Sequence, residues 1–147
     1  MTSLYIWLKF FHIFGIAVFL MGHGVSAGTS LALRGRPLDP MSRTLLRLSI
    51  RSQAIVWPAL GLIVVTGVWM GFAGSWWRTG WIWTSIAIFV AVLIVMGALS
   101  VPYHGARAVK EDAVADSPLA RSRPMALLLT GVVALIALLF LMVVKPF

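Results

Sequence analysis

Four long apolar stretches separated by more polar connections make up the pattern of this chain. They run over residues 4–33, 53–72, 80–101 and 124–144. A helix needs about 20 apolar residues to cross the hydrocarbon core of a bilayer, and each stretch has that length. The pattern therefore predicts an all-α integral membrane protein, with a single four-helix transmembrane domain over 1–147.

The basic residues gather in two of the three connections. The first connection carries Arg34, Arg36, Arg43, Arg47 and Arg51, and the third carries Arg107, Lys110, Arg121 and Arg123. The second connection has only Arg78. Because loops rich in Lys and Arg stay on the cytoplasmic side, we expect both termini on the outer, periplasmic side. This arrangement is typical of a multi-pass protein of the bacterial inner (plasma) membrane.

Tryptophans cluster around the second connection, at Trp69, Trp76, Trp77, Trp81 and Trp83. Amphipathic rings of this kind collect at the headgroup level of a bilayer, so the cluster agrees with the predicted outer side.

The first connection also contains a helix signal over 40–51. Asp39 is a typical N-cap, Pro40 suits the first helical position, and leucines alternate with arginines after them. We therefore expect a short amphipathic helix on the cytoplasmic membrane surface.

The composition excludes several classes of protein and of functional site. Of the 147 residues 61% are hydrophobic and 11% are charged, which excludes a water-soluble domain, and the absence of cysteine excludes disulfides and thiolate sites. The net charge of +8 comes mostly from residues that flank the spans, so we predict no nucleic-acid partner. All four acids, Asp39, Glu111, Asp112 and Asp116, fall in connections, which leaves no paired carboxylates for hydrolysis.

Ionisable groups inside a bilayer are costly and point to function. The candidates are Lys9, His12 and His23 on the first span and His104 just beyond the third. His12 and His23 are 11 residues apart, which places them within roughly 20° on a helix and about 16 Å apart along its axis. Their shared face is rich in small residues, which suit either close packing of another helix or a flat macrocycle ligated by an imidazole.

A haem would need axial ligands at a common depth. His23 and His104 both lie toward the cytoplasmic side, so they form a bis-histidine candidate if the third helix continues through Pro102. His12 lies in the outer half, where Met70 or Met142 is the candidate sixth ligand, or the iron is five-coordinate. Lys9, Arg78 and Lys145 are candidate partners for haem propionates, the alternative being that they extend to the lipid headgroups.

Several short motifs resemble HemJ-type protoporphyrinogen oxidases and related small bacterial membrane families of uncharacterised function. They are Trp7-x-Lys9-x-x-His12, Trp57-Pro58, Gly67-Val68-Trp69, Gly80-Trp81, Tyr103-His104-Gly105 and the ending Lys145-Pro146-Phe147. The resemblance implies a four-helix membrane oxidoreductase associated with haem b, and it places His12 on the essential first-helix histidine of that family.

Two elements of the HemJ-type pattern are missing. The family has a lysine early in the third helix, where Trp83-Thr84-Ser85 stands here, and an Asn-Glu-x-Pro motif before the fourth, where Ser122-Arg123-Pro124 stands here. We therefore interpret the chain as a relative that is closer to uncharacterised four-helix families and to copper-resistance D-type membrane domains than to an authentic HemJ-type oxidase.

Three functions follow from these features. The first is a haem b-binding or porphyrin-handling redox protein, with His12 as the iron ligand, His23 and His104 as further candidates, and Lys9 as a propionate partner. The second is a cofactor-free accessory subunit of a larger membrane complex or homo-oligomer, docked through the small-residue face of the first helix. The third is transport of copper or another small solute.

Overall fold

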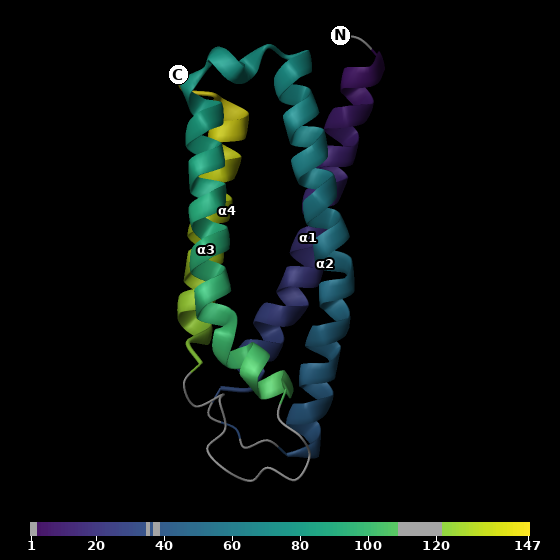
Figure 1. Ribbon diagram of the computed structural model, residues 1–147, viewed down its shortest axis with the longest axis vertical. Helices are drawn as coiled ribbons and strands as arrows, with labels where there is room; N and C mark the ends of the chain where they lie inside the picture. The colour runs from purple at the N-terminus through teal and green to yellow at the C-terminus, as the bar shows by residue number, and fades with distance from the viewer. Residues whose placement is uncertain (1–2, 35, 37–38, 109–121) are drawn as a thin grey trace.

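The computed structural model describes residues 3–34, 36, 39–108 and 122–147, and over these residues it contains helices and no strand (Figure 1). The helices are α1 (Ser3–Ala32), α2 (Pro40–Ala73), the short 3-10 helix η1 (Trp76–Arg78), α3 (Gly80–Ala108) and α4 (Pro124–Val144). The four α-helices are each long and apolar enough to cross a membrane. The predicted all-helical, four-span class is therefore confirmed.

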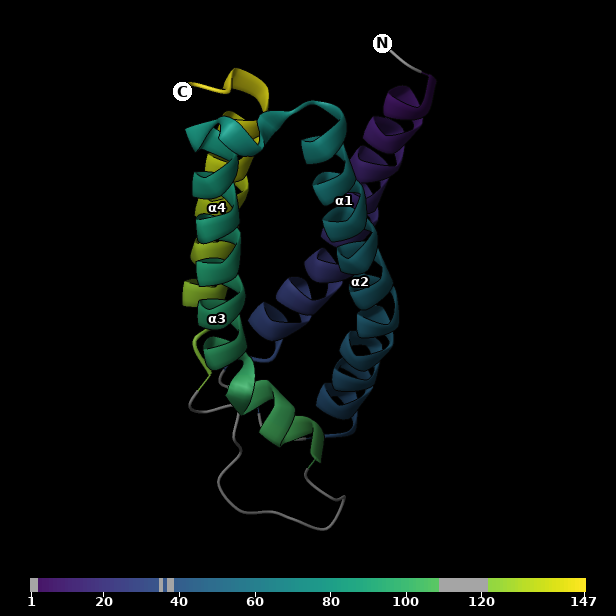
Figure 2. The same cartoon turned by 45° about the horizontal axis from the view of Figure 1, so that its top comes forward.

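The helices run up and down, so that the two ends of the bundle differ. The start of α1, η1 and the end of the chain lie together at one end, which we call the tryptophan end because η1 and the start of α3 carry Trp76, Trp77, Trp81 and Trp83 (Figures 1 and 2). The start of α2, with Arg43 and Arg47, lies at the other end, which we call the arginine end. The outward orientation of the tryptophan end stays a prediction. Lys110, Arg121 and the acids at 111, 112 and 116 lie outside the described residues.

The structure does not separate a surface helix over 40–51 from a span over 53–72. Both belong to α2, which is continuous from Pro40 to Ala73. Asp39 caps it as predicted, because its carboxylate accepts a hydrogen bond from the backbone N–H of Ser42 at 2.7 Å. The first turns do not turn away along the membrane surface because Ser42, Leu46 and Ser49 are buried in the bundle.

The third span is also longer than predicted. We expected it to end near residue 101, but α3 continues through Pro102 to Ala108. The extra turns cross toward α1 and α2 (Figure 2). There Tyr103 and Ala106 form a buried apolar cluster with Leu33 and Leu46, and the Tyr103 hydroxyl donates to the backbone oxygen of Ser30 at 3.4 Å. This cluster joins the helices at the arginine end.

Small residues bring α1 and α2 together as a tight hairpin. A Cβ added at Gly15 would lie 3.1 Å from Cγ1 of Ile63, and one added at Gly22 would lie 2.7 Å from Cγ2 of Val56 and 3.3 Å from the backbone oxygen of Ser52. Any side chain at Gly22 would thus collide with α2. The small-residue face of α1, a predicted docking surface for a partner subunit, is covered by α2 of the same chain.

The end of the chain folds back over the tryptophan end. The Lys145 ammonium lies 4.0 Å from the ring centroid of Trp76 and 5.4 Å from that of Trp81. The backbone N–H of Trp81 donates to the backbone oxygen of Phe147 at 3.1 Å, and the Phe147 ring occupies the space beside Gly80. A cation over aromatic faces is a favourable contact, so the exposed Lys145 is held over the tryptophan rings.

Candidate functional site

His12 is the most completely positioned ionisable group of the spans. It lies on α1 three turns from the start, is only 7% exposed, and faces α2. Its Nδ1 is 3.0 Å from the backbone oxygen of Ile63 and 3.0 Å from Oγ1 of Thr66. Two neighbouring turns of α2 therefore hold one nitrogen of the imidazole.

The hydrogen-bond network assigns the proton on this ring. The Ile63 carbonyl can only accept, and the Thr66 hydroxyl donates its own proton to the backbone oxygen of Leu62 at 2.5 Å. Both partners therefore accept a hydrogen bond from Nδ1 of His12, so the neutral ring carries its proton on Nδ1. The other nitrogen, Nε2, is left with its lone pair and has no hydrogen-bond partner among the described residues.

Gly67 makes room for the ring. A Cβ at this position would lie 3.1 Å from Cε1 of His12, closer than ordinary side-chain contacts. The imidazole therefore packs against bare backbone of α2. Sequence reasoning found Gly67 through the Gly67-Val68-Trp69 motif but missed Thr66 and Ile63. Thr66, a polar residue in an otherwise apolar run at the depth of His12, was the available signal.

His23 contacts a different part of the bundle from the part that His12 contacts. Its ring stacks on Phe19 with centroids 5.5 Å apart, and its Nε2 lies 3.8 Å from the position that a Cβ of Gly131 on α4 would take. The same position is 3.8 Å from Cε of Met96 on α3. The two histidines therefore share a face of α1 only loosely, because His12 contacts α2 whereas His23 points to the other hairpin.

The remaining predicted residues are less constrained. His104 is exposed, although its neighbour Tyr103 is buried in the cluster at the arginine end, and no contact joins His104 to His23 in the described part of the chain. Lys9 and Arg78 are exposed, the former one helical turn before His12. Met70 is buried one turn beyond Thr66, while Met142 is half-buried on α4.

A second polar cluster joins α1 to α2 nearer the arginine end. Ser26 is its centre: its hydroxyl is 3.0 Å from that of Ser52, accepts from Nε2 of Gln53 at 3.0 Å, and is 3.4 Å from the hydroxyl of Ser49. These groups satisfy one another, as polar groups between membrane helices must. The cluster is therefore structural, and it was not predicted.

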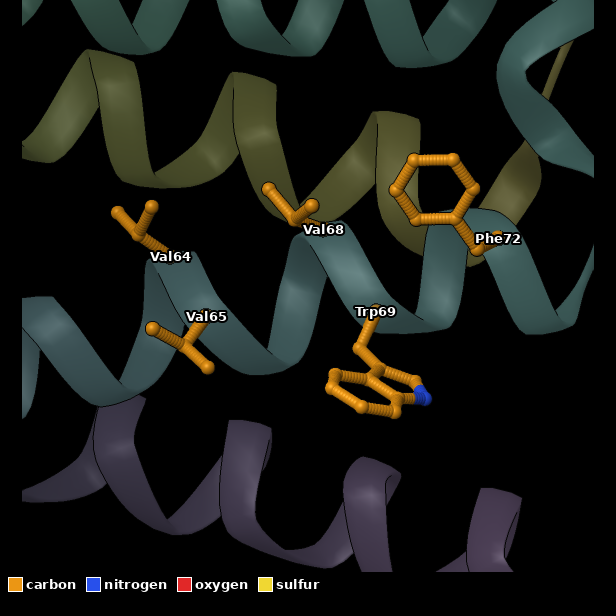
Figure 3. A pocket seen from close by; sticks show the side chains of 5 residues that line it. All are labelled: Val64, Val65, Val68, Trp69 and Phe72. Atoms are coloured by element: carbon orange, nitrogen blue, oxygen red, sulfur yellow. The ribbon is translucent and has the colours of Figure 1, made fainter.

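Over residues 3–34, 36, 39–108 and 122–147, no three His, Asp or Glu side chains come together in a way that could hold a metal ion. An apolar pocket of about 580 Å³ lies on α2, lined by Val64, Val65, Val68, Trp69 and Phe72 (Figure 3). None of these five side chains is a metal ligand. Within the described residues, the fold supplies one positioned imidazole and no multi-residue metal centre.

Four apolar helices and a histidine fixed between two of them define an integral membrane protein with its candidate site inside the bilayer. The chain belongs to the family described as predicted integral membrane protein (DUF2269), whose model matches residues 6–146. No curated protein and no solved structure matches the chain. The resemblance to HemJ-type proteins stays a prediction.

Proposed function

We propose that this protein binds haem b through Nε2 of His12. The observation that carries the proposal is the pair of contacts at the opposite nitrogen, where Nδ1 faces the Ile63 carbonyl and the Thr66 hydroxyl. Imidazoles that ligate metals almost always donate their other N–H to a carbonyl, carboxylate or water, which fixes the tautomer and orients the ring. His12 has this arrangement.

The contacts of His12 leave one ring nitrogen available to a ligand. Here one nitrogen is held and the other is left with its lone pair. Haem b bound there would supply one-electron redox chemistry, and the chain's own part is to hold the iron ligand neutral and oriented.

Two further residues near His12 are candidates for contacts with the haem. Lys9 is exposed one turn before His12 and is the propionate partner that we propose. Met70, buried one turn after Thr66, is the candidate sixth ligand. Lys145 is a weaker candidate because its ammonium already lies over Trp76 and Trp81.

The proposal covers haem binding and redox chemistry, and it does not extend to protoporphyrinogen oxidation. Where HemJ-type proteins have a lysine in the third helix, this chain has side chains with structural contacts. The Trp83 indole N–H donates to the backbone oxygen of Trp77 at 3.0 Å, and the Ser85 hydroxyl donates to that of Trp81 at 2.8 Å.

The test is a dithionite-reduced minus oxidised spectrum of protein purified after haem is supplied during expression, with pyridine haemochrome quantification. We expect a b-type spectrum with close to one haem per chain, its loss in His12→Ala, and its retention in the control His104→Ala. Thr66→Val should weaken haem binding about tenfold, the usual effect of removing a group that orients a ligand. Helical circular dichroism and a monodisperse elution profile would show that each variant is folded.

A blank spectrum for the wild type, or equal haem content in folded His12→Ala and wild type, would overturn the proposal. Loss of haem in His104→Ala with retention in His12→Ala would move the ligand to the arginine end and equally reject His12.

A further inference from the structure

We propose that the pocket on α2 and Arg78 together bind one anionic phospholipid at the tryptophan end, with an acyl chain in the pocket and the phosphate on Arg78. The pocket has a volume of about 580 Å³ and begins at Phe72, next to the tryptophan cluster. Its lining continues along α2 to Val64, which is roughly 12 Å deeper along the helix. Figure 3 shows the valines, Trp69 and Phe72 following one another over these turns.

The lining determines what part of a ligand it accepts. Four of the five side chains are purely hydrocarbon, and the fifth, Trp69, adds a single indole N–H. An extended acyl chain fits such a surface, whereas a ligand with several polar groups would leave them unpaired. Because the surrounding lipid tails are equally apolar, the pocket alone gives little preference for any one lipid. Selectivity must come from a charged group at its rim.

Arg78 is that group. The ring of Phe72, one of the lining residues, lies 5.2 Å from the ring of Trp77, and Arg78 is the next residue of η1. Its side chain is exposed. Lys145, the other cation beside the tryptophans, is held over the rings of Trp76 and Trp81.

Among the described residues, no acidic side chain lies near Arg78 to neutralise it. Asp39 is the one acid in the part of the chain that the structure describes, and it caps α2 at the opposite end. No described residue forms an ion pair with Arg78. A phosphate at the headgroup level supplies the missing charge, and the planar guanidinium can bind two of its oxygens at once.

This site is separate from the proposed haem ligand. The pocket side chains project from α2 away from the contacts of His12, which are made by Ile63, Thr66 and Gly67. Lipid binding at this site can therefore be tested independently of the haem content of the protein.

The experiment uses the full chain in phosphatidylcholine bilayers that contain a small, equal fraction of either phosphatidylglycerol or phosphatidylcholine with brominated acyl chains. Bromine quenches tryptophan fluorescence at short range, and the difference between the wild type and Trp69→Phe isolates the signal of Trp69. For the wild type we expect brominated phosphatidylglycerol to be enriched at Trp69 about fivefold over brominated phosphatidylcholine, the size of effect typical of one basic residue at a membrane surface.

Arg78→Gln should abolish this preference, and the matched control Arg51→Gln, an exposed arginine of α2 at the other end, should keep it. Val68→Phe, a change at an exposed position that fills the pocket without adding an indole, should reduce the quenching of Trp69 by both lipids. Equal quenching by the two lipids in the wild type, or an unchanged preference in Arg78→Gln, would overturn the proposal. Unchanged quenching of Trp69 in Val68→Phe would reject the pocket as the place of the acyl chain.

Discussion

The two helical hairpins of this protein are built on different principles. Between α1 and α2, hydrogen bonds cross at two levels, from His12 to Ile63 and Thr66 and from Ser26 to Ser52 and Gln53. Between α3 and α4, the described side chains make no such bond, and the hydroxyls of Thr84, Ser85 and Ser100 on α3 donate within their own helix. The first hairpin is fixed by polar pairs and close backbone approach, the second by the shape of apolar side chains.

This difference explains where the candidate site lies. Apolar packing between membrane helices gains little over packing against lipid, so it leaves the relative position of two helices weakly determined. Hydrogen bonds and glycine contacts determine it more closely. A ligand that must be held at a defined angle is therefore better placed on the first hairpin, and His12 is there.

The largest expected effect comes from breaking the close approach in the first hairpin. Gly22→Leu should lower the free energy of unfolding by about 3 kcal/mol, because even its Cβ would lie 2.7 Å from Cγ2 of Val56. Thermal unfolding in detergent, followed by circular dichroism, measures this. Gly28→Leu is the matched control on the same helix, since a Cβ there meets no atom within 4 Å. Equal melting temperatures for the two variants would mean that the hairpin is not packed as described.

A smaller effect is expected from removing the polar contacts while keeping the shape. Ser26→Ala should cost about 1.5 kcal/mol, because it leaves Ser52 and Gln53 without their partner across the hairpin. Ser85→Ala, which removes a buried hydroxyl of α3 that bonds only within α3, should cost much less. The same unfolding measurement compares the loss of stability in the two variants. If Ser85→Ala were as destabilising as Ser26→Ala, the contrast between the hairpins would be wrong.

The smallest effect on stability is expected at the N-terminal cap of α2. The hydrogen bond from the Ser42 N–H, aided by the charge of Arg36, lowers the pKa of Asp39 below its ordinary value of 3.8. Stability from this cap is therefore present above pH 3.8 and is lost as the pH falls through the lower folded value. At the start of α4, Arg123 forms no side-chain cap.

Melting temperatures of the wild type and Asp39→Asn, compared from pH 7 down to about pH 2, test this. Asparagine also caps helices but does not titrate, so the wild type should lose more stability on acidification than the variant. The difference isolates Asp39 from the other three acids, which titrate in both proteins. Parallel pH profiles would show that the ionised carboxylate of Asp39 stabilises the folded protein no more than a neutral cap does.

Much of the fold could be predicted because the bilayer imposes it. Apolar runs of membrane length required helices, and α4 begins at Pro124 and ends at Val144 as expected. The errors were at helix ends that lie beyond the apolar runs. Leucines among arginines at 40–51 fit a surface helix and an extension of α2 equally well, and only contacts of Leu46 and Ser49 with other helices distinguish the two.

The candidate site was predicted in part. His12 stood out because an ionisable side chain in an apolar run is costly, and the cost is visible in sequence alone. The partners of its Nδ1 were not visible, since Ile63 contributes a backbone carbonyl, which every residue has. The pairing of His23 with His104 could not be judged from sequence either, because it depends on which way α1 and α3 turn their faces.

The sequence by itself determined that this protein is a four-span membrane protein with its ionisable groups on the first helix, because hydrophobic length and charge placement act residue by residue. The tertiary structure alone decided that His12 meets α2 while His23 meets α4, and that Lys145 closes over the tryptophans. Such contacts depend on helix rotation and crossing, which are set by the fit of Gly15, Gly22 and their neighbours across the interface.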